Sequence, residues 1–145
     1  MTTIIYCHKT KQIAIDSRQT AGSDIVNNDY DKTRYKKADL WFLSGTIAEV
    51  DNFMNHEHKD KIDSPFNCRA LFISNRKVYL AVNSDDHMLI EELGANCGLG
   101  SGAYWAESAL DFGKSVREAV EYAATKDCNT GGKVRVFNLD QEEVL

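Results

Sequence analysis

Residues 2–16 read TTIIYCHKTKQIAID. Two short segments rich in apolar and β-branched residues, Thr3–Cys7 and Gln12–Asp16, lie on either side of the polar positions 8–11. Such segments are typical of β-strands, and a short polar connection between two of them indicates a hairpin. The sequence therefore predicts a β-hairpin at the start of the chain.

Two more hairpins are expected further along the chain. Tyr35–Lys37 is followed closely by the apolar Leu40–Leu43, and Arg69–Ser74 is separated from Lys77–Val82 by two residues that suit a tight turn. The segment Lys133–Leu139 again has the composition of a strand. Strands joined as hairpins are antiparallel, so the sequence predicts antiparallel sheets.

Three other stretches have the three- and four-residue spacing of apolar positions that is typical of helices. One follows Gly102 and covers Ala103–Leu110, and another opens with a capping-box pattern at Ser115 and ends near Lys126. A shorter helix is expected at positions 47–54. Helices together with antiparallel hairpins predict the α+β class.

Length and composition indicate one domain over residues 1–145. The chain is 43% hydrophobic, which is enough for one buried core, and it has one proline and no Gly/Ser-rich linker. No apolar stretch approaches the ~18 residues of a membrane-spanning helix, and no secretion signal precedes the first strand. We therefore expect a cytoplasmic protein with no membrane partner. The net charge of −5 and the scattered basic residues exclude a nucleic-acid partner.

The cysteines and histidines do not form a metal motif. The cysteines are widely spaced and form no C-x-x-C pair; they are Cys7, Cys68, Cys97 and Cys128. Free thiols are the expectation for such a pattern, and zinc is not. His56 and His58 are two residues apart and would lie on different faces of a helix, so a solvated surface explains them better than a metal site.

Thr2 directly follows the initiator methionine. A small second residue favours removal of Met1, which would leave Thr2 at the N-terminus without a propeptide. A terminal threonine holds its hydroxyl beside its own α-amine, whose pKa of about 7.7–8.0 in model peptides suits a general base at neutral pH. Many chains begin with Met-Thr, so a catalytic role for Thr2 depends on the residues that accompany it.

Those residues occur in a recognisable order. They are Thr2-Thr3-Ile4, Asp16-Ser17-Arg18-Gln19-Thr20-Ala21-Gly22, Lys32, Ser44-Gly45-Thr46, Gly100-Ser101-Gly102 and Asp127-Cys128-Asn129-Thr130-Gly131-Gly132. The ensemble resembles the proteasome β-subunit family of N-terminal nucleophile hydrolases, which includes the bacterial proteasome-like heat-shock peptidase. The resemblance spans nearly the whole chain and implies an αββα sandwich, in which two antiparallel sheets lie between helix layers.

The resemblance also implies roles for individual residues. Thr2 is the implied nucleophile and base, Lys32 the lysine beside it, and Asp16 the carboxylate that pairs with Lys32. A second positive charge near an amine disfavours its protonation, so Lys32 would lower the pKa of the Thr2 amine and stabilise the deprotonated hydroxyl. Without these partners, Asp16 would be interpreted as a turn residue.

A second group of residues supports the threonine in the family pattern. Ser101 and Asp127 match the pair that hydrogen-bonds the threonine amine and relays protons, and Thr130 replaces the usual serine. An alternative for Ser101 is a helix N-cap, and the two interpretations are compatible. The N–H of Gly45 matches the donor to the oxyanion.

Substrate and cation sites are likewise implied by the resemblance. An extended substrate would pair with the main chain near Thr20 and Gly45. The implied walls of a mostly apolar first pocket are Gln19, Tyr30, Leu43 and Ile47, which with Thr20 make up the implied substrate-binding residues. No cofactor is required, and the backbone carbonyls of Thr125, Cys128 and Gly131 match those that often bind a sodium or magnesium ion.

One departure from the family concerns the outer helix layer. Family members have two long helices where this chain offers only Ile47–Cys68, so one helix fits and the layer is shortened. The resemblance implies a threonine-type endopeptidase that cleaves unfolded polypeptide inside a homo-oligomeric ring, with an ATP-dependent unfoldase as a further partner. Two alternatives stay open: a small-molecule amidase or acylase of the same superfamily, and an inactive ring or scaffold subunit.

Overall fold

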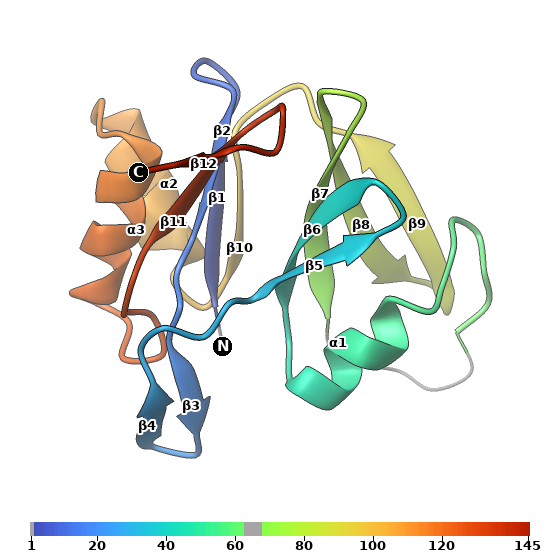
Figure 1. The fold of residues 1–145 in the computed structure, drawn as a ribbon, viewed down its shortest axis with the longest axis horizontal. Helices are drawn as coiled ribbons and strands as arrows, with labels where there is room; N and C mark the ends of the chain where they lie inside the picture. Colours follow the sequence, from blue (N-terminus) through green and yellow to red (C-terminus); the bar gives the residue numbers. More distant parts are fainter. Residues whose placement is uncertain (1, 63–67) are drawn as a thin grey trace.

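The computed structural model describes residues 2–62 and 68–145 and arranges them in four layers (Figure 1). Met1, whose removal the sequence predicts, lies outside these residues. Two antiparallel sheets face each other; two helices cover the outer face of one sheet, and a short helix covers the outer face of the other. The predicted α+β class and the αββα sandwich with a shortened helix layer are confirmed.

The first sheet is built around the N-terminal hairpin. Its strand order is β10-β1-β2-β11-β12, and all neighbouring strands are antiparallel. The strands are β1 (Thr3–Cys7), β2 (Gln12–Ile15), β10 (Cys97–Gly100), β11 (Arg135–Asn138) and β12 (Glu143–Val144). Because side chains alternate along a strand, β1 buries Ile4 and Tyr6 between the two sheets and Ile5 beneath the helices. The predicted hairpin at residues 3–16 is therefore present, and Asp16 directly follows β2.

The second sheet contains both of the other predicted hairpins. Its order is β5-β6-β7-β8-β9. The strands are β5 (Thr33–Lys36), β6 (Asp39–Ser44), β7 (Arg69–Ser74), β8 (Lys77–Ser84) and β9 (His87–Glu92). Strand β5 begins at Thr33, two residues earlier than expected, and this places its start close to Lys32.

The helices lie where their apolar spacing predicts. Helices α2 (Ala103–Asp111) and α3 (Val116–Ala124) cover the first sheet, and α1 (Ile47–Phe53) covers the second. Both hydrogen bonds of the predicted capping box at Ser115 are present. Within the described residues, no helix is long and apolar enough to cross a membrane.

A small hairpin that the sequence did not predict lies apart from both main sheets. It consists of β3 (Gln19–Ala21) and β4 (Asp24–Asn27), which pair only with each other (Figure 1). All four residues of β4 are exposed. With no buried face, β4 has no alternation of apolar and polar residues that sequence analysis could detect.

Candidate active site

Thr2 lies immediately before β1 and is 2% exposed. The neighbouring strand β10 approaches it closely, since a Cβ added to Gly100 would lie 1.7 Å from the Thr2 carbonyl oxygen. Gly100 also has φ = +93°, a backbone conformation that side-chain-bearing residues rarely adopt. Gly100 therefore allows β10 to pass next to the start of the chain and hold Thr2 in place.

Thr2 opens onto a cleft of about 340 Å³. Lys32 and Gly45 line the same cleft, and so do all five of the residues that the sequence assigned to substrate binding: Gln19, Thr20, Tyr30, Leu43 and Ile47. These residues come from β3, the segment before β5, the end of β6 and the start of α1. The fold thus brings together segments that are more than forty positions apart in the sequence.

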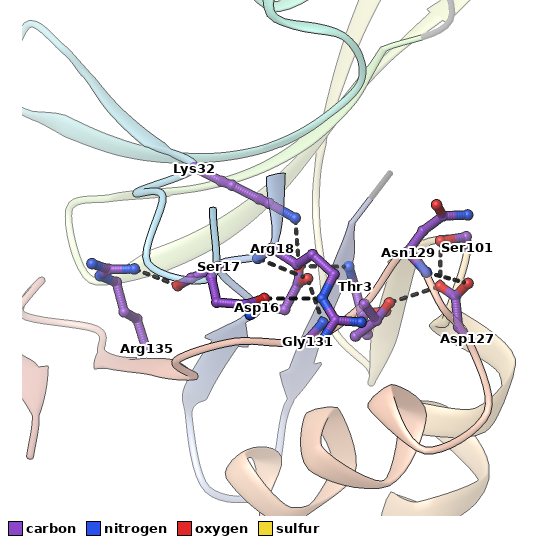
Figure 2. A network of polar contacts seen from close by, with 12 residues as sticks. Thr3, Asp16, Ser17, Arg18, Lys32, Ser101, Asp127, Asn129, Gly131 and Arg135 are labelled. Carbon is purple, nitrogen blue, oxygen red and sulfur yellow. Dashed lines mark hydrogen bonds and ion pairs between the residues drawn. The ribbon is translucent and has the colours of Figure 1, made fainter. Parts of the chain in front are cut away.

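Asp16 and Lys32 form a buried ion pair (Figure 2). Lys32 Nζ lies 2.8 Å from Asp16 Oδ1, and the side chains are 8% and 0% exposed. The carboxylate also accepts hydrogen bonds from the N–H groups of Thr3 at 3.1 Å and Gly131 at 3.0 Å. Both carboxylate oxygens are therefore held by the protein, and they fix the position of the lysine. Asp16 is not the turn residue that it would be without its partners.

The environment of Lys32 changes its proton affinity. Burial lowers the pKa of Lys32, and the charge of and hydrogen bond to Asp16 raise it, as does the charge of Asp127, while the Arg18 charge lowers it. Burial dominates, so the pKa of Lys32 lies below the ordinary lysine value. The lysine is thus a positive charge in a partly desolvated position at the wall of the cleft.

Ser101, Asp127 and Thr130 form a second polar network (Figure 2). Asp127 Oδ2 accepts hydrogen bonds from Ser101 Oγ at 2.5 Å and from Thr130 Oγ1 at 2.7 Å. Thr130 Oγ1 is also 2.6 Å from Thr3 Oγ1. Since the single hydroxyl proton of Thr130 is given to Asp127, the Thr3 hydroxyl is the donor to Thr130.

Hydrogen bonding keeps Asp127 ionised. Burial alone would raise the pKa of Asp127, but hydrogen bonds from Ser101, Thr130 and the Asn129 N–H together lower it. Asp127 is accordingly an acceptor for surrounding donors at neutral pH.

Thr3 joins the two networks, and sequence reasoning did not identify it. Its N–H donates to Asp16 and its hydroxyl contacts Thr130, so the residue next to Thr2 is anchored from both sides. The interpretation of Ser101 as an N-cap was wrong. The N-cap of α2 is Gly102, and the Ser101 hydroxyl bonds to Asp127 instead.

Gly102 is packed against this junction. A Cβ at Gly102 would lie 2.1 Å from Thr3 Oγ1 and 3.1 Å from Thr130 Oγ1, although the backbone itself, at φ = −96°, would accept alanine. We therefore expect Gly102→Ala to lower the free energy of unfolding by about 1–3 kcal/mol, the usual cost of overpacking. Urea denaturation measures this loss. Gly94→Ala is the matched control, because nothing lies within 4 Å of its added Cβ; equal stability of both variants would contradict the packing argument.

Gly45 lies one residue before Thr46, the N-cap of α1. Its N–H makes no hydrogen bond to another described residue, and it lines the cleft together with Thr2. A free N–H group at the start of a helix is suited to receive a developing negative charge.

Arg18 and Arg34 also line the cleft, and the sequence analysis did not identify either as a site residue. Arg18 donates through Nε to Asn28 and through Nη1 to the Cys128 carbonyl, 3.0 Å each. Strand alternation could have found Arg34, since it lies two positions after Lys32 and therefore on the same side of the extended chain.

The predicted carbonyl cation site is already occupied in part by protein donors. The Cys128 carbonyl accepts from the Arg18 guanidinium, and the Gly131 carbonyl accepts from the Ser17 N–H at 3.1 Å. A sodium or magnesium ion bound by Thr125, Cys128 and Gly131 stays a prediction, and such an ion would have to compete with the fixed charge of Arg18.

The histidine pair is used for structural hydrogen bonds. His56 Nδ1 lies 2.9 Å from the Asn52 carbonyl oxygen, and His58 Nδ1 accepts from the Ile90 N–H at 3.0 Å. Over residues 2–62 and 68–145, no cluster of three or more His, Cys, Asp or Glu side chains is placed to hold a metal.

Known structures share this fold. HslV from Trypanosoma brucei aligns with a TM-score of 0.70 and 15% identity, covering 93% of this chain and 97% of that one. BPH from Thiobacillus denitrificans aligns with a TM-score of 0.69 and 18% identity, covering 94% and 96%. The same protein solved in complex with epoxomicin aligns with a TM-score of 0.68 and 18% identity, covering 94% and 97%. No protein-family model and no curated protein sequence matches the chain. The chain thus has the HslV-like, proteasome-type fold of these structures.

Proposed function

We propose that this chain is a threonine-type endopeptidase whose nucleophile is the Thr2 hydroxyl after removal of Met1. The observation that carries the proposal is the shared cleft, in which Thr2 meets Lys32 and Gly45 beside the segments predicted to hold an extended peptide. The proteasome-type fold supports the same chemistry, since it is shared with HslV and BPH.

The reaction follows from the groups around Thr2. The α-amine of Thr2 takes the hydroxyl proton as Oγ1 attacks the peptide carbonyl, and the Gly45 N–H stabilises the resulting oxyanion. The amine then passes this proton to the departing nitrogen, which leaves an ester on Thr2. Water hydrolyses the ester by the same steps, and the free carboxylic acid departs.

The two polar networks are given supporting roles. The cation of Lys32 lowers the cost of removing the hydroxyl proton and disfavours protonation of the amine. Ser101 and Asp127, linked to Thr130, hold the loop beside Thr3 and supply acceptors and donors near the amine. Asp16 acts through Lys32 and is a positioning residue.

We further propose that the subunit works as a cytoplasmic homo-oligomeric ring on unfolded polypeptide, with an ATP-dependent unfoldase as partner. An open cleft with an active nucleophile would endanger other proteins of the cell, and enclosure in a ring removes that hazard. Sedimentation velocity of the purified protein tests the ring, since a monomer at micromolar concentration would contradict it.

The intact mass of the protein, with and without epoxomicin, tests the enzyme proposal. T. denitrificans BPH, which shares the fold, has been solved in complex with this compound. We expect a protein that lacks Met1 and gains one adduct, which peptide mapping places on Thr2. A retained Met1, or no adduct on a free Thr2, would contradict the proposal, because the amine is then blocked or the hydroxyl is inert. Turnover of short acyl amides without cleavage of longer peptides would favour a small-molecule amidase.

A further inference from the structure

The cleft beside Thr2 is positively charged in a protein of net charge −5. Among its described lining residues three are cationic, Arg18, Lys32 and Arg34, and none is acidic. Lys32 is neutralised by Asp16, but neither arginine forms an ion pair with a carboxylate of residues 2–62 or 68–145. The cleft therefore has two guanidinium charges that no carboxylate of the described chain balances.

Arg34 has donors left for a ligand. It donates through Nη1 to the carbonyls of Asp31 at 3.2 Å and Thr33 at 2.9 Å, and through Nη2 to the Tyr30 hydroxyl at 3.0 Å. A guanidinium has five N–H groups, so two are without an acceptor in the described chain. Arg18 donates through Nε to Asn28 and through Nη1 to the Cys128 carbonyl, so three of its N–H groups are without an acceptor in the described chain.

Tyr30 adds a third donor at the same place. Its hydroxyl oxygen accepts from Arg34, so its own proton is available to another acceptor. Tyr30, Lys32 and Arg34 follow one another at intervals of two residues and all line the cleft, as expected for side chains on one side of an extended segment. Tyr30 is also one of the residues assigned to the first substrate pocket.

We propose that Arg34 and Tyr30 form a site for a carboxylate of the substrate, so that cleavage is favoured after an acidic residue. This inference rests on the function proposed above and replaces the mostly apolar first pocket expected from the sequence with one that has a cationic end. A planar guanidinium matches the two oxygens of a carboxylate, and a charge-assisted bond in a partly buried cleft is stronger than a neutral one. Leu43 and Val50 supply the apolar wall that packs against the methylene groups of a glutamate side chain.

Binding to the Thr2→Ala variant tests the site without relying on catalysis. Two peptides blocked at both ends and differing only in Glu or Gln at the residue before the scissile bond are titrated by calorimetry. We expect the Glu peptide to bind about 10- to 100-fold more tightly, the range of a charge-assisted hydrogen bond. Adding Arg34→Met should reduce this ratio to near one, and Arg34→Lys should leave an intermediate ratio. A third peptide, with Gln at that position and a free C-terminus, tests whether a terminal carboxylate is the ligand instead.

Arg76→Met is the matched control, because Arg76 lies in the turn between β7 and β8, at the opposite end of the sheets from Thr2 (Figure 1). It should leave the Glu/Gln ratio unchanged. Equal binding of the two blocked peptides, or a ratio that survives Arg34→Met, would overturn the proposal. If the third peptide binds more tightly than the Glu peptide, the bound carboxylate is a free C-terminus and not an acidic side chain, and the proposed specificity is overturned. If epoxomicin reacts with Thr2 of the wild type and the two blocked peptides bind equally well, the specificity proposal is rejected and the peptidase proposal is retained.

Discussion

Thr2→Ala is expected to reduce peptide cleavage by about 10⁴-fold or more, the scale of loss when a covalent nucleophile is removed. The variant keeps the N-terminal amine, Lys32 and the whole cleft, so it lacks only the oxygen that forms the acyl-enzyme. The change removes only one hydroxyl and one methyl group from residue 2, which lies before the first strand, so the fold should be retained. Cleavage of a fluorogenic peptide, measured with circular dichroism as a check on folding, gives the result.

Thr2→Ser is the matched control for that experiment, since it keeps the hydroxyl and the amine. We expect it to retain measurable cleavage and capture by epoxomicin, although loss of the methyl group leaves its rotamer less restricted. A second form, which carries one extra residue before Thr2, keeps the hydroxyl but buries the amine in a peptide bond. Activity of this extended form equal to wild type would show that the amine is not the base.

The sequence predicted the elements whose apolar residues form a recognisable run or spacing. Strands β1, β2, β6 and β7 are buried on both faces, and they and β8 have nearly continuous apolar runs. Helices α2 and α3 have apolar residues at helical spacing, because one face of each packs on the first sheet. Strand β4 is exposed throughout, and β10 has two glycines in four residues, so neither has a pattern. What places β10 is its close approach to Thr2, a tertiary contact that no local signal encodes.

The residues of the candidate site could likewise be predicted only in part. Asp16, Lys32, Gly45 and Asp127 could be assigned because their order along the chain resembles a known family. Their contacts could not be derived locally. The Asp16 carboxylate, for example, accepts from the N–H groups of Thr3 and Gly131, which lie 13 and 115 positions away from it in the sequence.

Thr3, Arg18 and Arg34 were missed for a different reason. Each is brought to the site by strand register or by contact with a loop that is distant in the sequence. Arg18, for example, lies against Gly131. A Cβ at Gly131 would lie 2.4 Å from Arg18 Cζ, so the glycine that resembles part of a family motif also makes room for a charge. Motif order predicts which residues belong to the site, and packing decides how they contact one another.

Lys32→Met is expected to lower kcat/KM by about 10²–10⁴-fold, the usual contribution of a group that assists proton transfer. Methionine has a similar length and no charge, so the variant removes the cation from the wall of the cleft. The Thr2 amine then loses a neighbouring positive charge, and its pKa rises. Residual activity should therefore continue to increase at a pH where the wild-type rate has levelled off. A pH–rate profile measures this shift, which a purely structural role for the lysine would not produce.

The same change also has a cost in stability that must be separated from catalysis. It leaves the Asp16 carboxylate buried without its cation, and breaking a buried pair in this way typically costs about 3–5 kcal/mol. Rates are therefore measured well below the unfolding temperature of the variant. Lys36→Met is the matched control, because Lys36 lies four positions along the chain, at the end of β5, and pairs with Glu57 instead of lining the cleft. We expect Lys36→Met to change kcat/KM by less than about threefold, since Lys36 is not one of the residues that line the cleft. Equal losses in both variants, with unshifted pH profiles, would mean that Lys32 supports only the fold, and the role of the Asp16–Lys32 pair in activating Thr2 would have to be abandoned.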